Sequence, residues 1–167
     1  MTVFDVNKQA IVGDVKDLRH AHGVLAVPEL HRVYASATGT NELAVIDDQN
    51  LTIVARVPAG DYPDGIAYAA KENKIYVSDL HGKADTVIDA KTNQRITTIE
   101  LGGGAGNSQY DPTSDRIFVT GDGREELADR MGIGEEGGNA SEVALPLLRV
   151  QAIVEQQGPQ LPRQRLT

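Results

Sequence analysis

The sequence of 167 residues contains no cysteine and no tryptophan, and only 4% of its residues are aromatic. Without cysteine the chain has no disulfide, no thiolate ligand for a metal ion and no cysteine nucleophile. Basic residues are also scarce, because 16 Lys and Arg stand against 24 Asp and Glu and give a net charge of −8. We therefore expect no non-specific binding to nucleic acid or to an anionic membrane, both of which favour a positive protein.

Long apolar segments are missing as well. No apolar run approaches the roughly 18 residues that predict a transmembrane helix. Residues 1–20 carry Asp5, Asp14 and Asp17 and lack an apolar core, so no signal peptide is expected there.

The sequence does contain a gap-free repeat of 42 residues. Asp5, Asp47 and Asp89 are spaced by this interval. The interval also relates four apolar sets, which are Val3, Val45 and Val87; Val15, Val57 and Ile99; Val33, Ile75 and Ile117; and Tyr34, Tyr76 and Phe118. A fixed period near 40 residues indicates one supersecondary unit stacked on copies of itself.

Each repeat encodes four short strands. In the copy from Gly65 to Gly102, segments rich in apolar or β-branched residues at 65–68, 75–77, 86–88 and 95–99 alternate with polar turns. Four strands in a repeat of this length are typical of a β-propeller blade. The fourth strand is the most polar and should lie outermost. The expected core consists of Ile66, Ile75, Tyr76, Val77, Val87 and Ile88, with the equivalent residues Tyr34, Val45 and Ile46.

Three motifs resemble those of the YVTN-type, or YncE-like, β-propeller family. The strand motif Tyr-Val-(Thr/Ala/Ser)-Asn is matched at 76–79 and more weakly at 34–37 and 118–121. A Val-Ile-Asp triplet stands at 45–47 and 87–89, and a Gly/Pro-rich link stands at 60–65. The resemblance covers residues 1 to about 128 and implies an all-β propeller. Members of the family are commonly periplasmic or extracellular, and the resemblance implies no particular reaction.

The repeat region supplies about three four-stranded blades. Residues 1–18 match the last two strands of a blade, 19–60 and 61–102 are complete blades, and 103–128 begin another. Propellers contain roughly four to eight blades, so these cannot close a ring. Because the first and last pieces are complementary halves, two chains could complete each other's split blade as a homodimer of about six blades. The competing expectation is aggregation through the open edges.

The period stops after residue 128. Where a Val-Ile-Asp triplet is due, the sequence reads Asp129-Arg130-Met131, and residues 129–167 contain no aromatic residue and no lysine. One interpretation is an irregular C-terminal extension with a helix near 141–157. The other is a frameshift that replaced the original continuation. Either way, we expect a disordered or poorly packed tail.

Candidate site residues lie in the links between strands. His20 and His22 precede a first strand at the expected channel rim, and they could bind a metal ion or simply contact water and neighbouring polar groups. Asp61 and Asp64 flank Pro63 and could bind a hard cation such as Ca²⁺, although Asp beside Pro and Gly is typical of turns.

Asp79 and His81 follow a second strand and could activate a water molecule, but no partnered nucleophile accompanies them. Asp5, Asp47 and Asp89 recur in every copy, so we interpret them as turn residues. The glycine-rich link at 102–106 is followed by a predicted strand rather than a helix, which argues against a phosphate-binding loop.

Two functional hypotheses follow from these patterns. The first is a non-enzymatic interaction module that binds a protein or a small molecule and needs no cofactor. The alternative is a metal-dependent enzyme or redox-protein remnant that uses the rim His and Asp residues.

The frameshift interpretation makes a prediction about the coding DNA. Reading another frame after codon 128 should restore a Val-Ile-Asp-like triplet followed by further 42-residue repeats. Sequencing that region tests this directly, and the absence of a repeat in either alternative frame would contradict the interpretation.

Overall fold

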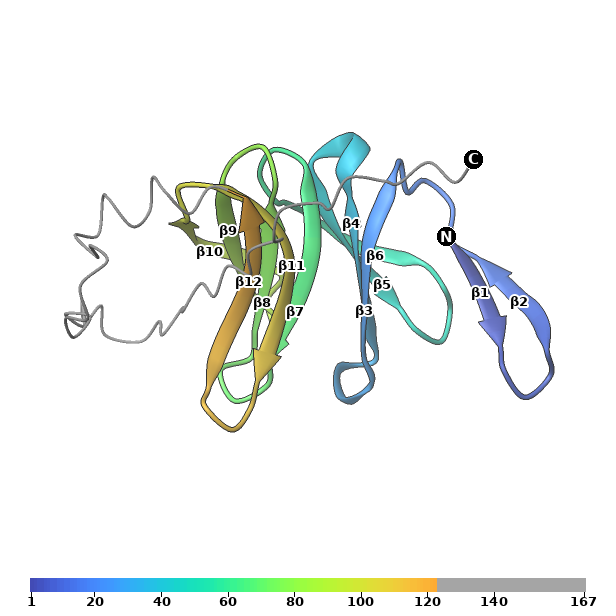
Figure 1. The fold of residues 1–167 in the computed structure, drawn as a ribbon. Helices are drawn as coiled ribbons and strands as arrows, with labels where there is room; N and C mark the ends of the chain where they lie inside the picture. Colours follow the sequence, from blue (N-terminus) through green and yellow to red (C-terminus); the bar gives the residue numbers. More distant parts are fainter. Residues whose placement is uncertain (123–167) are drawn as a thin grey trace, which may run out of the picture.

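The computed structural model describes residues 1–122, which form twelve β-strands in four antiparallel sheets (Figure 1). Two sheets are complete and have four strands each, paired in chain order. The first contains β3 (Ala21–Val27), β4 (Arg32–Ala37), β5 (Glu42–Asp47) and β6 (Ile53–Pro58). The second contains β7 (Pro63–Ala69), β8 (Lys74–Asp79), β9 (Ala84–Asp89) and β10 (Gln94–Glu100). Two short 3₁₀ turns, η1 (Pro28–Leu30) and η2 (Thr38–Thr40), flank β4.

Two hairpins flank the complete sheets. The first is β1 (Thr2–Asp5) with β2 (Ala10–Asp14), and the second is β11 (Gly104–Asp111) with β12 (Arg116–Asp122). The prediction of an all-β partial propeller built from four-stranded blades is therefore confirmed. The predicted tail at 129–167 and the end of the predicted partial blade lie outside the described residues. Among residues 1–122, no helix is long and apolar enough to cross a membrane.

The burial of each strand follows its position in the sheet. In the second sheet, β8 and β9 are almost entirely buried, whereas most side chains of β10 are exposed, as predicted for a polar outermost strand. Eight of the nine predicted core residues are at most 4% exposed. The exception is Ile66, which is only partly buried.

The recurring Asp residues form turns. The Oδ1 atom of Asp47 accepts the backbone N–H groups of Gln49 and Asn50 at 3.0 and 2.9 Å. Asp89 does the same with Lys91 and Thr92, at 2.9 and 2.8 Å. These backbone donors lower the pKa of both carboxyl groups. Each Asp therefore fixes the hairpin between the third and fourth strands of its blade.

The core is divided among three seams, by which we mean the interfaces between successive sheets. The second seam joins the two complete sheets and includes Tyr34 and Leu43 from one and Ile75 and Ile88 from the other. The third seam joins the second complete sheet to the β11–β12 hairpin. The first seam, between the β1–β2 hairpin and the first complete sheet, holds only three fully buried apolar residues, which are Val15, Ala35 and Ile46.

A hydroxyl on the second strand of each complete sheet bridges the seam to the next sheet. Ser36 Oγ accepts the N–H of Gly23 at 2.6 Å and donates to the carbonyl oxygen of Asp64 in the next sheet at 2.7 Å. Ser78 makes the equivalent bond to the carbonyl oxygen of Gly106. A Cβ atom on Gly23 would collide with the Asp64 carbonyl, so this close approach requires glycine.

The buried aromatic ring of Tyr76 provides a test of this core. Replacing Tyr76 with Ala should lower the free energy of unfolding by about 3–5 kcal/mol, because the change leaves a cavity in the third seam. The control is Ile96→Ala on β10, where the side chain is 49% exposed and the loss should stay below about 1 kcal/mol. Urea unfolding measures both, and a Tyr76→Ala loss as small as the control's would mean that the packing is wrong.

Candidate functional site

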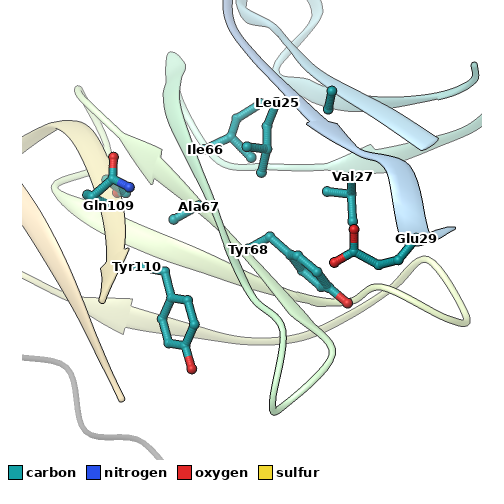
Figure 2. Close-up of a pocket in the computed structure, with 10 residues that line it drawn as sticks. Leu25, Val27, Glu29, Ile66, Ala67, Tyr68, Gln109 and Tyr110 are labelled. Carbon is teal, nitrogen blue, oxygen red and sulfur yellow. The ribbon is translucent and has the colours of Figure 1, made fainter. Parts of the chain in front are cut away.

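A groove runs across the first strands of three consecutive sheets (Figure 2). It has a volume of about 200 Å³. Its lining comes from the end of β3 with η1, from the middle of β7 and from β11, and consists of Leu25, Ala26, Val27, Glu29, Ile66, Ala67, Tyr68, Ser108, Gln109 and Tyr110. The first strand of each blade lines the central channel of a propeller. This groove therefore lies on the side of the sheets that faces the channel in a propeller, which we call the channel face.

Repeat positions explain which side chains enter the groove. Ile66 and Ser108 are equivalent residues 42 apart, as are Tyr68 and Tyr110. Ile66 and Tyr68 also pack against the second-seam core, which explains why neither is fully exposed. Figure 2 places Tyr68 beside Glu29, and burial together with the Glu29 carboxylate raises the pKa of the Tyr68 hydroxyl. The groove thus combines apolar walls with two phenols and one carboxylate.

Two of the predicted rim residues, Asp61 and His81, lie where the link between β6 and β7 meets the loop between β8 and β9. The backbone N–H of Leu80 donates to the carbonyl oxygen of Tyr62 at 3.1 Å, and that of His81 donates to Asp61 at 3.2 Å. These bonds hold the two loops together at one end of the second sheet.

Four side chains form a cluster at this rim. Nδ1 of His22 lies 4.0 Å from Oδ1 of Asp64. The ring of Tyr62 contacts both histidines, with its centroid 5.2 Å from that of His22 and 4.5 Å from that of His81. Tyr62, a residue that the sequence reasoning did not select, thus links His22 to His81, and Asp64 lies beside His22.

The Asp79 side chain contacts the backbone of Asp61 rather than its carboxylate. The Asp79 carboxylate is 3% exposed and accepts the N–H groups of Asp61 and Gly82 at 2.9 and 2.7 Å. Burial raises the pKa of this carboxyl group, while the two backbone donors oppose the rise. Asp79 therefore holds the rim loops in place.

His20 and His22 contact different neighbours. His20 adopts a left-handed conformation with φ of 49° at the position equivalent to Tyr62, where φ is 66°. Its exposed ring lies close to Gly39, whereas His22 faces Asp64. Within residues 1–122, no group of three or more His, Asp or Glu side chains is arranged to hold a metal ion. A metal site at His20 and His22 stays a prediction.

A buried carboxyl group lies outside the predicted set. Asp85 on β9 is 0% exposed, and neither of its carboxyl oxygens has a hydrogen-bond partner among the described residues. Burial raises its pKa to about 7, and the charge of Asp79 acts in the same direction. Leu43 occupies the equivalent position one repeat earlier and is fully buried in the second seam.

Ser108 shows a parallel change on the facing hairpin. It replaces the equivalent Ile66, and its buried hydroxyl also has no partner among residues 1–122. Two apolar positions of the second seam are thus polar in the third. A comparison of the repeats position by position would have found both substitutions.

Comparisons with known proteins support the fold. No protein-family model matches the sequence. No curated protein matches it either. A solved β-propeller domain of the Myceliophteria thermophila protein Cps50 (Swd1) is similar, with a TM-score of 0.51 and 7% identity over 59% of this chain and 31% of that one.

Two further solved structures are similar over a larger part of the chain. The dihydro-heme d1 dehydrogenase NirN has a TM-score of 0.61 and 17% identity, over 71% of this chain and 27% of its own. The hydrazine synthase of Kuenenia stuttgartiensis has a TM-score of 0.59 and 17% identity, over 67% of this chain and 32% of its own. This chain thus spans about a third of the length of these structures. The likeness defines it as a propeller-type module.

The elevated pKa of Asp85 makes stability depend on pH. The carboxyl group holds its proton more tightly in the folded state, at about 7, than in the unfolded state, near 3.8. Its contribution to the free energy of unfolding therefore falls as pH rises from about 3.8 to 7. Asp85→Leu should stabilise the protein, and by about 2–3 kcal/mol more at pH 8 than at pH 5.

Asp85→Asn is the matched control for this test. Like Asp85→Leu, it removes the titrating group, so its effect on the free energy of unfolding should also be about 2–3 kcal/mol larger at pH 8 than at pH 5. Its gain at each pH should be smaller than that of Asp85→Leu, because a polar group stays buried. Urea unfolding at the two pH values measures both effects. An equal effect of Asp85→Leu at pH 5 and pH 8 would contradict the prediction.

Proposed function

We propose that this chain is part of a YVTN-type β-propeller that acts as a non-enzymatic binding module, with its ligand in the channel-face groove. The observation that carries the proposal is the groove itself, because three consecutive sheets contribute to one concave surface. Concave, mostly apolar surfaces with a few placed polar groups are the usual form of ligand sites. Support for the family comes from β8, where the serine of the Tyr76–Asp79 motif bridges a seam.

The chemistry of the groove favours a cationic or hydrogen-bond-donating ligand with an apolar body. Leu25, Val27 and Ile66 offer the apolar contact, and Tyr68 offers an aromatic face beside the Glu29 carboxylate. A cation is attracted both by an aromatic face and by a carboxylate. The net charge of −8 would also attract a cation from a distance.

The size of the groove limits what can enter it. A volume of about 200 Å³ is below the roughly 300–1,000 Å³ of drug-sized pockets. A ligand group of side-chain size fits this space. We therefore propose either a small cationic molecule or a single Lys or Arg side chain from a protein partner.

The contacts at the rim also support a binding role. The Asp79 carboxylate accepts two backbone N–H groups, and Tyr62 packs between His22 and His81. These groups hold loops together, as a scaffold requires.

Benzylammonium and benzoate form a probe pair that tests the proposal, because they share a ring and carry opposite charges. In titrations followed by NMR, benzylammonium should shift amide signals of β3, β7 and β11, and benzoate should bind more weakly. Tyr68→Ala and Glu29→Gln should each weaken benzylammonium binding about five- to tenfold. Val54→Ala, on the exposed face of β6, is the control and should change nothing. Shifts outside the groove, or equal binding of the two probes, would contradict the proposal.

A further inference from the structure

We propose that Asp85 acts as a proton-controlled latch on the third seam, the interface between the second complete sheet and the β11–β12 hairpin. While its carboxyl group is protonated, the seam stays closed. Loss of the proton favours opening of the seam, and β11 then no longer forms its wall of the groove. As regulation of ligand binding the latch rests on the proposed function, whereas the opening of the seam does not.

The register of the second complete sheet points Asp85 into this seam. Asp85 lies opposite Ser78 on β8 and opposite Ile99 on β10. Residues directly opposite each other point to the same face of a sheet. Ser78 bonds to the carbonyl oxygen of Gly106 on β11, and Ile99 packs against the third-seam core. The Asp85 carboxyl group is therefore turned toward the β11–β12 hairpin.

Ser108 faces the same seam from the other side. Its equivalent, Ile66, packs against the core of the preceding seam. Tyr110, two residues further along β11 and on the same face, packs against the third-seam core. Ser108 also lines the groove, together with Gln109 and Tyr110. Movement of β11 away from Asp85 would therefore move a wall of the groove at the same time.

The buried carboxyl group makes this seam sensitive to protons. Asp85 is 0% exposed, and neither of its oxygens has a hydrogen-bond partner among residues 1–122. An ionised carboxylate in such a place lacks both water and donors, which costs free energy. Opening of the seam admits water to it. The closed seam therefore favours the protonated form, and the open seam favours the ionised form.

The charge that acts on Asp85 strengthens this preference. Among the described residues it comes from Asp79, at the end of β8, whose like charge opposes ionisation of Asp85. Burial raises the pKa of Asp79 as well, whereas the backbone donors of Asp61 and Gly82 and the charge of Arg95 lower it. Asp79 thus has donors and a cation that support its charge, and Asp85 has neither in the part of the chain that the structure describes.

The phenols of the seam stay neutral between pH 5 and pH 8. Burial raises the pKa of Tyr76 on β8 to about 12. A hydrogen bond to Asp115 raises the pKa of Tyr110 on β11 to about 12. The Glu72 carboxylate acts in the same direction on both phenols. β7 and β12 contribute apolar side chains to this core, which are Ala67, Ala69, Ile117 and Val119.

The second seam provides an internal comparison, because it has a similar backbone arrangement without the carboxyl group. Leu43 takes the place of Asp85 and lies opposite Ser36. Ile66 takes the place of Ser108. Both seams keep the bond from a serine hydroxyl to the following sheet. An effect of pH on the third seam that the second seam does not share therefore points to Asp85.

The direction of the pH effect follows from the two forms of the seam. The pKa of Asp85 is about 7 while burial keeps water away, and near 3.8 when water reaches it. Because the closed seam has the higher pKa, its stability is greatest below pH 3.8, falls as pH rises to about 7 and is constant above that value. The equilibrium constant for opening should therefore rise about 100-fold between pH 5 and pH 8.

The absence of native cysteine allows both seams to be tested with introduced thiols. Val119 in the third seam and Val77 in the second are equivalent residues 42 apart, and they are 3% and 0% exposed. The full chain with Val119→Cys or with Val77→Cys is treated with 4,4′-dithiodipyridine at pH 5 and pH 8. Each labelling rate is divided by that of the same variant unfolded in urea at the same pH, which removes the reactivity of the thiol itself.

The relative labelling rate of Val119→Cys should rise about 100-fold from pH 5 to pH 8. At pH 8 it should exceed that of Val77→Cys, because the second seam stays closed. Adding Asp85→Asn should abolish the rise. Adding Asp17→Asn, which removes an exposed carboxyl group at a left-handed position that asparagine tolerates, should keep it. Equal rates at the two cysteines at pH 8, a Val119→Cys rate that does not change with pH, or a rise that survives Asp85→Asn would overturn the proposal.

Benzylammonium separates the latch from the proposed function. If it binds the groove only while β11 is in place, ten times its Kd should slow the labelling of Val119→Cys at pH 8 about tenfold. A pH-dependent opening that Asp85→Asn abolishes but benzylammonium does not slow would establish the latch and contradict groove binding.

Discussion

The close approach of successive first strands is the constraint on which the rest of this structure depends. Ser36 and Ser78 each bond to a carbonyl oxygen of the following sheet, and the glycines at 23 and 65 allow that sheet to come near enough. The apolar residues of each seam can then reach across it. Because one hydroxyl and one glycine recur at a fixed interval, each sheet meets the next in a similar way, and the row of sheets takes on the form of a propeller.

The two best-packed seams have the same geometry but different chemistry. In the second seam Leu43 and Ile66 are apolar, and in the third their equivalents are Asp85 and Ser108. A buried carboxyl group without a partner costs free energy, and the neutral, protonated form reduces that cost. The raised pKa of Asp85 is the consequence. The repeat thus tolerates two buried polar residues, Asp85 and Ser108, in a seam where Ser78 still bonds to the following sheet.

Much of the fold could be predicted from the sequence because each residue can be compared with the residues at the same position in the other repeats. The 42-residue spacing located the strands, the buried Tyr34 and Tyr76 and the turn-forming Asp47 and Asp89. The site was harder to predict because it is formed between copies. Tyr62 joins His22 to His81 across 59 residues of chain, and the groove draws on three sheets. A period describes one blade well, but it does not reveal which side chains of neighbouring blades meet.

The groove and the seams share residues, and this limits which residues of the groove can change without loss of packing. Ile66 lines the groove and packs against the second-seam core, so a substitution there alters both the wall of the groove and the packing between the sheets. Tyr110 is equivalent to Tyr68, and its hydroxyl bonds to Asp115 at 2.7 Å within its own hairpin. Glu29 and Gln109 are exposed groove residues that belong to none of the buried core clusters. These two positions can vary with little effect on the fold, so they are where the chemistry of the groove is free to diverge.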